Sequence, residues 1–268
     1  MKDAYSGKPG TDWQLATGPF VFSGPPDACL GEVELTNLSH EKQKIRTLDT
    51  TPNARPGKEK QPLPACRLQL GARLPPGFEG ALSARLELDR TTPPGHYGAE
   101  IKCGSRKAKL DITVAPHHEL LIEPTHIRLR GASKDTLTAE LTLTNHGNLA
   151  VPLDDVAMVW LREQDWIGRT LVDTLRSCDP KDDYETFANN LLQQFRQDQL
   201  QPVRISFQPS RKEPLAPGET LQRQLSLTLP AGLQKGRHYR GFIKIGEDRI
   251  WLELYCNGSA VSEKRRAT

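Results

Sequence analysis

The histidines are the residues whose type and spacing come closest to a metal site. The stretch APHHELLIEPTHIRL places His117, His118 and His126 near one another in the chain. Imidazole nitrogens are common zinc ligands, and a linker and the strand after it could bring them together. Adjacent residues on a strand point in opposite directions, however, and no fourth ligand follows at a known spacing. We therefore expect exposed histidines and no bound metal, with metal-assisted catalysis as the lowest-ranked alternative.

Other catalytic patterns are missing from the sequence. It contains no Gly-x-Ser-x-Gly elbow, no phosphate-binding Gly-Lys-Ser/Thr loop and no Gly-x-Gly-x-x-Gly dinucleotide motif. Cys178 has no neighbouring histidine or other base that would lower its thiol pKa and make it a nucleophile. The sequence thus predicts a protein that is not an enzyme and uses no cofactor.

Bulk composition favours a soluble protein of two ordinary domains. The chain has 268 residues and a net charge of +3, which is too small by itself to indicate nucleic-acid binding. The basic runs 102–109 and 263–268 have no aromatic residues between their charges for base stacking. No apolar segment is long enough to span a membrane. These features predict neither a membrane protein nor a strong nucleic-acid partner.

Cysteine usage and the start of the chain bear on the compartment. Five cysteines form no C-x-x-C pair, and the first residues lack the apolar stretch of a secretory signal. Reduced thiols and no signal favour the cytoplasm. A secreted or periplasmic protein whose signal sequence had been removed would show the same pattern.

The elements that would position any site come from a repeat. PPGHYGAEIKCGSRKAKLDITV, from residue 93, is matched by QKGRHYRGFIKIGEDRIWLELY, from residue 234. Upstream, 31–45 resembles 139–153, since both alternate apolar and polar residues and contain Leu-Thr-Asn. This alternation is typical of strands with one buried face. The chain therefore contains one strand-rich module twice.

A second pair of segments supplies the remaining strands. Residues 75–97 and 216–239 each contain a Pro-Gly turn, an alternating strand and a corner rich in proline or glycine. Short strands separated by turns predict antiparallel β-sandwiches. Tyr97 and Tyr239, at the start of the first strand of the repeated phrase, are expected to form tyrosine corners, with the hydroxyl bonded to nearby backbone. A paired binding site is the less favoured alternative.

Several of these phrases resemble bacterial immunoglobulin-like or fibronectin III-like modules. The resemblance is carried by Leu-Thr-Asn-x-Gly-Asn at 143–148, LAPGE at 215–219 and the glycines and isoleucine around the repeated tyrosine. It covers most of 19–115 and 119–256. It implies a β-sandwich fold and the spacer, scaffold or interaction roles of such modules, and it carries over no catalytic residue.

The second copy has roughly 33 residues that the first copy lacks. They lie in 162–201, where the apolar period changes from two to that of a helix. A first helix would present Trp166, Ile167, Leu171 and Leu175. A second would carry a stripe formed by Tyr184, Phe187, Ala188, Leu191, Leu192 and Phe195. The stripe could cap its own sandwich or contact a partner, and the candidate partner-binding residues are Trp160, Trp166, Phe187 and Phe195.

Together these patterns predict an all-β protein of two tandem immunoglobulin-like antiparallel β-sandwiches, the second with an α-helical insertion. The expected domains are 1–116 and 117–258, with insertion 162–201 and a disordered basic tail, 259–268. The expected function is a non-catalytic accessory, scaffold or assembly subunit that binds another protein. Binding would use the insertion, the loop 50–65, the β-sandwich surfaces or an edge strand that pairs with a partner strand. The alternative is a carbohydrate or cell-surface ligand-binding module accessory to an enzyme, which would need exposed aromatics on one sheet face.

Overall fold

The computed structural model describes residues 5–52, 61–63, 66–104, 106–179, 181, 183–197 and 201–257. Most of these residues lie in strands, which confirms the predicted all-β class. The chain divides into two compact units. Unit 1 comprises 1–119 with the short segments 145–150 and 216–218, and unit 2 comprises 120–144, 151–215 and 219–268. The predicted domain bounds stay a prediction, and the predicted tail lies outside the described residues.

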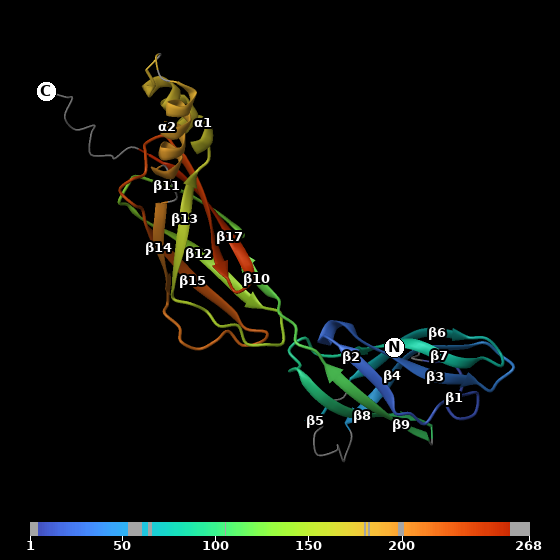
Figure 1. Cartoon of the computed structure of the whole chain (residues 1–268). Coiled ribbons are helices and arrows are strands. Elements are labelled where there is room, and N and C mark those ends of the chain that lie inside the picture. The colour runs from blue at the N-terminus through green and yellow to red at the C-terminus, as the bar shows by residue number, and fades with distance from the viewer. Residues whose placement is uncertain are drawn as a thin grey trace. The chain divides into compact units, whose positions relative to one another are not determined.

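Unit 1 is built from mostly antiparallel strands (Figure 1). Along these strands, buried and exposed residues alternate. A 3-10 turn (Pro26–Ala28) connects the second strand to the third. The sheet order is β1-β3-β2-β9-β8-β4-β6-β7; β3 also pairs with β7, and β5 pairs with β8. The strands are β1 (Trp13–Leu15), β2 (Phe20–Gly24), β3 (Cys29–Asn37), β4 (Gln43–Pro52), β5 (Gln61–Pro62), β6 (Arg67–Leu74), β7 (Glu79–Glu87), β8 (Gly95–Cys103) and β9 (Arg106–Val114).

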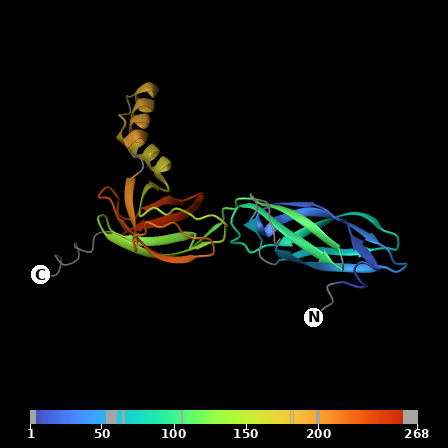
Figure 2. The ribbon, with the colours of Figure 1, turned by 90° about the horizontal axis from the view of Figure 1, so that it is seen from below.

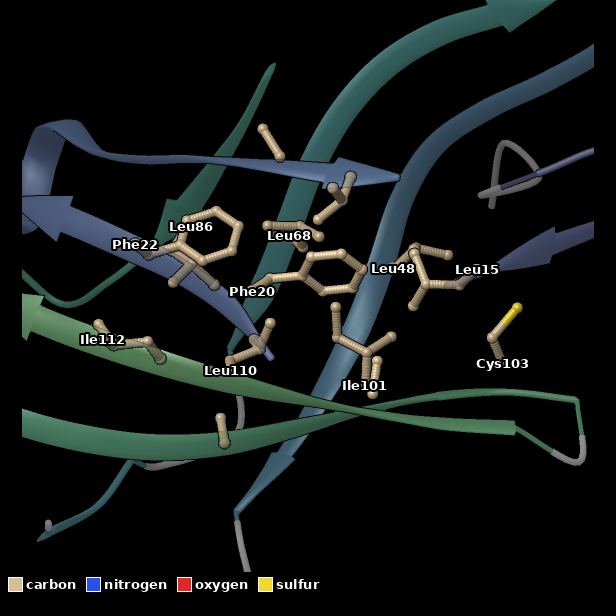
Figure 3. Close-up of a cluster of buried hydrophobic side chains, with 14 of the residues drawn as sticks. Leu15, Phe20, Phe22, Leu48, Leu68, Leu86, Ile101, Cys103, Leu110 and Ile112 are labelled. Carbon is tan, nitrogen blue, oxygen red and sulfur yellow. The ribbon is translucent and has the colours of Figure 1, made fainter. Parts of the chain in front are cut away.

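The core of unit 1 lies between strands that are far apart in sequence. Phe20 and Phe22, on alternate positions of β2, point into a cluster with Leu68, Leu86 and Ile101 (Figure 3). Trp13 is fully buried. Burying these side chains removes large apolar areas from water, which is the main force that holds the strands together.

Unit 2 has a closely similar order of strands. The order is β10-β12-β15-β14-β13-β16-β17-β11, and β11 runs parallel to β17. Its core consists of inward-facing strand residues such as Leu141, Ile205, Leu225 and Ile243. The strands are β10 (Leu120–Glu123), β11 (His126–Gly131), β12 (Thr136–Asn145), β13 (Val156–Glu163), β14 (Gln201–Gln208), β15 (Thr220–Thr228), β16 (His238–Ile245) and β17 (Asp248–Cys256).

The predicted tyrosine corners are both present. The Tyr97 hydroxyl donates a hydrogen bond to the Pro93 carbonyl at 2.8 Å. The Tyr239 hydroxyl accepts one from the Gln234 amide, also at 2.8 Å. Burial raises the pKa of both phenols, so each stays protonated at neutral pH. Both tyrosines therefore tie the start of a strand to the preceding turn, as a structural role requires.

Candidate functional site

Two helices connect β13 to β14 in unit 2. They are α1 (Trp166–Ser177) and α2 (Tyr184–Gln197), and they project from one end of the strands (Figures 1 and 2). Asp183 caps α2, since its Oδ1 accepts the Thr186 amide at 2.8 Å. This hydrogen bond lowers the pKa of the Asp183 carboxyl. Neither helix is long and apolar enough to cross a membrane, and this holds for the described residues.

A charged cluster fixes the base of α1. Arg169 donates two hydrogen bonds to Glu163, from Nε at 3.0 Å and from Nη2 at 2.6 Å. The Nη1 atom of Arg237, in the loop before β16, lies 3.3 Å from Oε1 of Glu163. Glu163 is buried at the end of β13. A bidentate contact between arginine and a carboxylate fixes the relative position of the two side chains as well as adding energy. This cluster therefore holds the start of α1 against the end of β13.

The two helices pack on each other. The rings of Trp166 and Phe195 meet edge to face, with their centroids 5.4 Å apart. The Thr174 hydroxyl donates to Oε1 of Gln194 at 2.8 Å. The core cluster of unit 2 is drawn from strands and loops, so the apolar stripe of α2 does not cap the sandwich. Phe195 of the stripe packs on α1, whereas Tyr184 and Leu192 are 83% and 56% exposed.

A second face of α1, next to the buried row, is apolar and exposed. Ile167, Leu171 and Leu175 follow one another at intervals of four residues, which places them along one helix face. Ile167 and Leu175 are 56% and 59% exposed. The buried positions of the helix are instead Thr170 and Thr174. The helix is thus amphipathic with its apolar face outward, and we call these three side chains the α1 apolar face.

The predicted partner-binding residues do not form one patch. Trp166 and Phe195 are in contact with each other, and Phe187 is half-buried on α2. Trp160 is 53% exposed on β13. The loop 50–65 falls largely outside the described residues. Ile167, Leu171 and Leu175 stand out in the sequence as apolar residues four positions apart, but this spacing by itself does not show that the face is exposed.

The three histidines have separate neighbours. Nε2 of His117 is 3.3 Å from a carboxylate oxygen of Glu119, and His118 is exposed. Nδ1 of His126 is 3.2 Å from the Thr125 hydroxyl. In the described part of the chain, no three histidine, cysteine, aspartate or glutamate side chains are grouped to hold a metal ion.

Comparison with known proteins gives no family. No protein-family model and no curated protein matches the chain. Among solved structures, a protein of unknown function from Porphyromonas gingivalis W83 is 14% identical, with a TM-score of 0.27, covering 91% of this chain and 99% of that one. The chaperone-tip adhesin complex of CFA/I fimbriae biogenesis is 11% identical, with a TM-score of 0.25 and coverage of 93% and 100%. Titin domains z1z2 in complex with telethonin are 9% identical, with a TM-score of 0.27 and coverage of 92% and 97%. Likeness at this level carries no argument about function.

Proposed function

We propose that this chain is a non-catalytic scaffold or assembly subunit, built of two immunoglobulin-like modules, that binds another protein through its helices. The observation that carries the proposal is the α1 apolar face, Ile167, Leu171 and Leu175. Apolar residues repeated at this spacing are how an amphipathic helix docks into a hydrophobic groove. The partner would therefore present an apolar groove. Tyrosine corners in both units support the immunoglobulin-like assignment.

The helix is well suited to present a rigid surface. Its base is held by the contacts of Arg169 with Glu163, and its inner side is fixed by Thr174 and by the ring contact with α2. A side chain whose backbone is already ordered loses less conformational entropy on binding. The α1 apolar face thus needs little rearrangement to bind a groove.

The test is a capture experiment from lysate of the native host with the whole chain as bait. The double variant Ile167→Glu, Leu175→Glu is compared with Val21→Glu, an exposed apolar residue of unit 1. Circular dichroism first establishes that all three proteins fold. We expect one defined protein to be retained by the wild type and by Val21→Glu, and lost by the double variant. Retention by all three would refute docking through α1.

A second design separates the helices from the strands. Replacing 165–200 with a short Gly/Ser loop removes both helices and leaves the ends of β13 and β14, which pair with each other from Leu161↔Gln201 inward. We expect a folded protein that captures no partner. If this variant still captures the same partner, binding lies on the β-strands.

A further inference from the structure

Exposed aromatic residues form a row across one sheet face of unit 2. Phe242 on β16 pairs with Trp251 on β17, which pairs with His126 on β11. On the other side, Arg162 of β13 pairs with Arg240 of β16. Trp160 and Phe242 each lie two residues further along these strands. The β13 and β16 backbones remain adjacent there, because a Cβ on Gly241 would lie 2.8 Å from the Trp160 carbonyl oxygen.

The rings in this row are accessible. Trp160, Phe242 and Trp251 are 53%, 42% and 43% exposed. Phe242 and Trp251 meet edge to face, with their centroids 5.8 Å apart. Large apolar rings are usually buried. A row of them on an outer face therefore indicates a binding site whose ligand covers the rings.

Basic residues flank the aromatic row on both sides. Alternate residues of a strand share a face and lie about 7 Å apart, so the neighbouring rows are two residues away. We call the resulting surface, on β11, β13, β16, β17 and the first half of β14, the aromatic–arginine face. One flanking row contains Arg162, Arg240, Glu253 and Arg128; the other contains Arg204, Met158, Lys244 and Arg249.

The charge on this face is strongly one-sided. Among the described residues of the two flanking rows, the carboxylate is that of Glu253, which forms ion pairs with Arg128 at 3.2 Å and with Arg240 at 3.1 Å. The guanidinium of Arg249 lies 4.9 Å from the centre of the Phe242 ring. The row of exposed rings therefore lies between two rows of mainly basic side chains, each about 7 Å away. A single extended polymer could contact all three rows.

We infer that the aromatic–arginine face binds single-stranded nucleic acid. Bases would stack on the rings of Trp160 and Trp251, and phosphates would lie against the flanking arginines and Lys244. Such platforms bind with little sequence preference, because every base has a stacking face. The inference is independent of the docking role of α1, since it concerns a different surface and a different class of ligand.

Two features favour this ligand over others with flat rings or charge. A neutral sugar would use the aromatic row but would offer no negative charge to the basic side chains that flank it. Duplex DNA would use the arginines, but its bases are already stacked and cannot cover the rings. A single strand offers both phosphates and unstacked bases at the spacing of the rows.

The measurement is fluorescence anisotropy of a labelled oligothymidine of about 20 nucleotides, titrated with the full chain at several salt concentrations. We expect binding that weakens with salt and quenches tryptophan fluorescence. Trp160→Ala and Trp251→Ala should each weaken binding by about tenfold, and the Phe variants at both positions should restore most of the loss. No binding at low salt overturns the inference.

Charge-reversal variants test the flanking rows. Lys244→Glu and Arg249→Glu should weaken binding and reduce the slope of log K against log salt by about 0.7 for each phosphate that is no longer neutralised. The control is Lys102→Glu, an exposed lysine on the corresponding strand of unit 1, which should leave binding unchanged. An equal effect of Lys102→Glu means diffuse attraction and overturns the inference.

Competing ligands complete the design. Duplex DNA of the same length should compete poorly, and so should an acidic polysaccharide of similar charge density. If duplex DNA binds as tightly, and the tryptophan variants bind it normally, the face is a general polyanion surface and the inference fails. If the polysaccharide binds more tightly and depends on Trp160 and Trp251, the ligand is a glycan, and the nucleic-acid assignment is wrong.

Discussion

The same connection differs sharply between the two units. Strands β3, β4, β6, β7, β8 and β9 pair with one another as β12, β13, β14, β15, β16 and β17 do. In unit 1, the chain between β4 and β6 contains most of the predicted loop 50–65. In unit 2, the chain between β13 and β14 contains both helices. Two features that looked unrelated in the sequence thus occupy one topological position. Variation concentrates at a connection because it leaves the core pairing intact.

The outer faces of equivalent strands also differ. In unit 1, exposed positions of β8 and β9 hold Lys102, Lys107 and Lys109, and Lys107 lies 3.8 Å from Glu100. In unit 2, the equivalent strands present the aromatic–arginine face. A shared framework therefore supports a mixed-charge polar surface in one copy and rings between arginines in the other. The pairing of the strands determines the fold that the two units share, and the exposed residues determine the different surface chemistry of each unit.

The largest expected difference between the units concerns a buried arginine. Arg223, only 2% exposed, pairs with Leu141 on β12, and the equivalent pair in unit 1 is Leu82 with Val33. Arg223 donates to Asp155 and to the Phe207 and Pro209 carbonyls. Arg223→Ala should lower the free energy of unfolding by about 3 kcal/mol, because it leaves these acceptors without their partner.

Urea unfolding of the full chain measures this loss, with Leu82→Ala as the matched change in unit 1. Leu82 is half-buried, so its truncation should cost about 2 kcal/mol at most. A larger loss for Leu82→Ala than for Arg223→Ala would show that the arginine is not integral to unit 2.

The tyrosine corners should differ by a smaller amount. Tyr239→Phe removes the acceptor of the Gln234 amide, and Tyr97→Phe removes the donor to the Pro93 carbonyl. We expect a loss of about 1.5 kcal/mol for Tyr239→Phe and about 1 kcal/mol for Tyr97→Phe, because an amide has a single hydrogen to satisfy. Thermal unfolding of both variants provides the comparison, and a reversed order would contradict it.

Acid should act on unit 2 through Asp155. Hydrogen bonds from the Ser210 hydroxyl, the Arg211 amide and Arg223 lower the pKa of this carboxyl to about 2. A carboxyl with a lowered pKa in the folded state stabilises the protein above its unfolded pKa of about 4. That stability is lost as the pH falls from about 4 to about 2.

The check is the unfolding temperature of wild type and Asp155→Asn across this pH range. The variant should be less stable at pH 7 and should lose less stability as the pH falls. Parallel curves for the two proteins would show that Asp155 does not carry this dependence.

The smallest expected effect is chemical. Burial raises the pKa of the Cys29 and Cys103 thiols, both in unit 1, to about 11, so few thiolates exist at pH 8. We expect iodoacetamide to label both thiols slowly. Mass spectrometry of the peptides measures the extent of labelling at each cysteine. Cys178, half-buried at the end of α1, should react first. Early labelling of Cys29 would indicate that unit 1 opens locally.

Much of the framework could be predicted because it is local. Alternation marked Val33 and Leu35 as buried, and the stripe of α2 was evident from Tyr184 to Phe195. Both tyrosine corners followed from the turn before each strand. These patterns depend on neighbours within a few residues, and the backbone geometry of strands and helices fixes what such neighbours do.

The surfaces could not be predicted in the same way. Trp160, Phe242 and Trp251 belong to three strands, and their alignment depends on the register between β13 and β16. The basic runs in the sequence lack interleaved aromatics, whereas folding brings aromatics and arginines together from separate segments. The exposure of Ile167 and Leu171 likewise depends on which side of α1 packs against α2.

The parallel pairing of β11 with β17 has a mechanical consequence. β11 follows the short strand β10 at the start of unit 2, and β17 is the last of its strands. The two pair from His126↔Trp251 to Gly131↔Cys256. Tension that draws the start of β11 and the end of β17 apart acts along both strands in opposite directions. Every hydrogen bond between them is then loaded at once in shear, and none can be peeled open first. Unit 2 is therefore arranged to resist extension along its own strands.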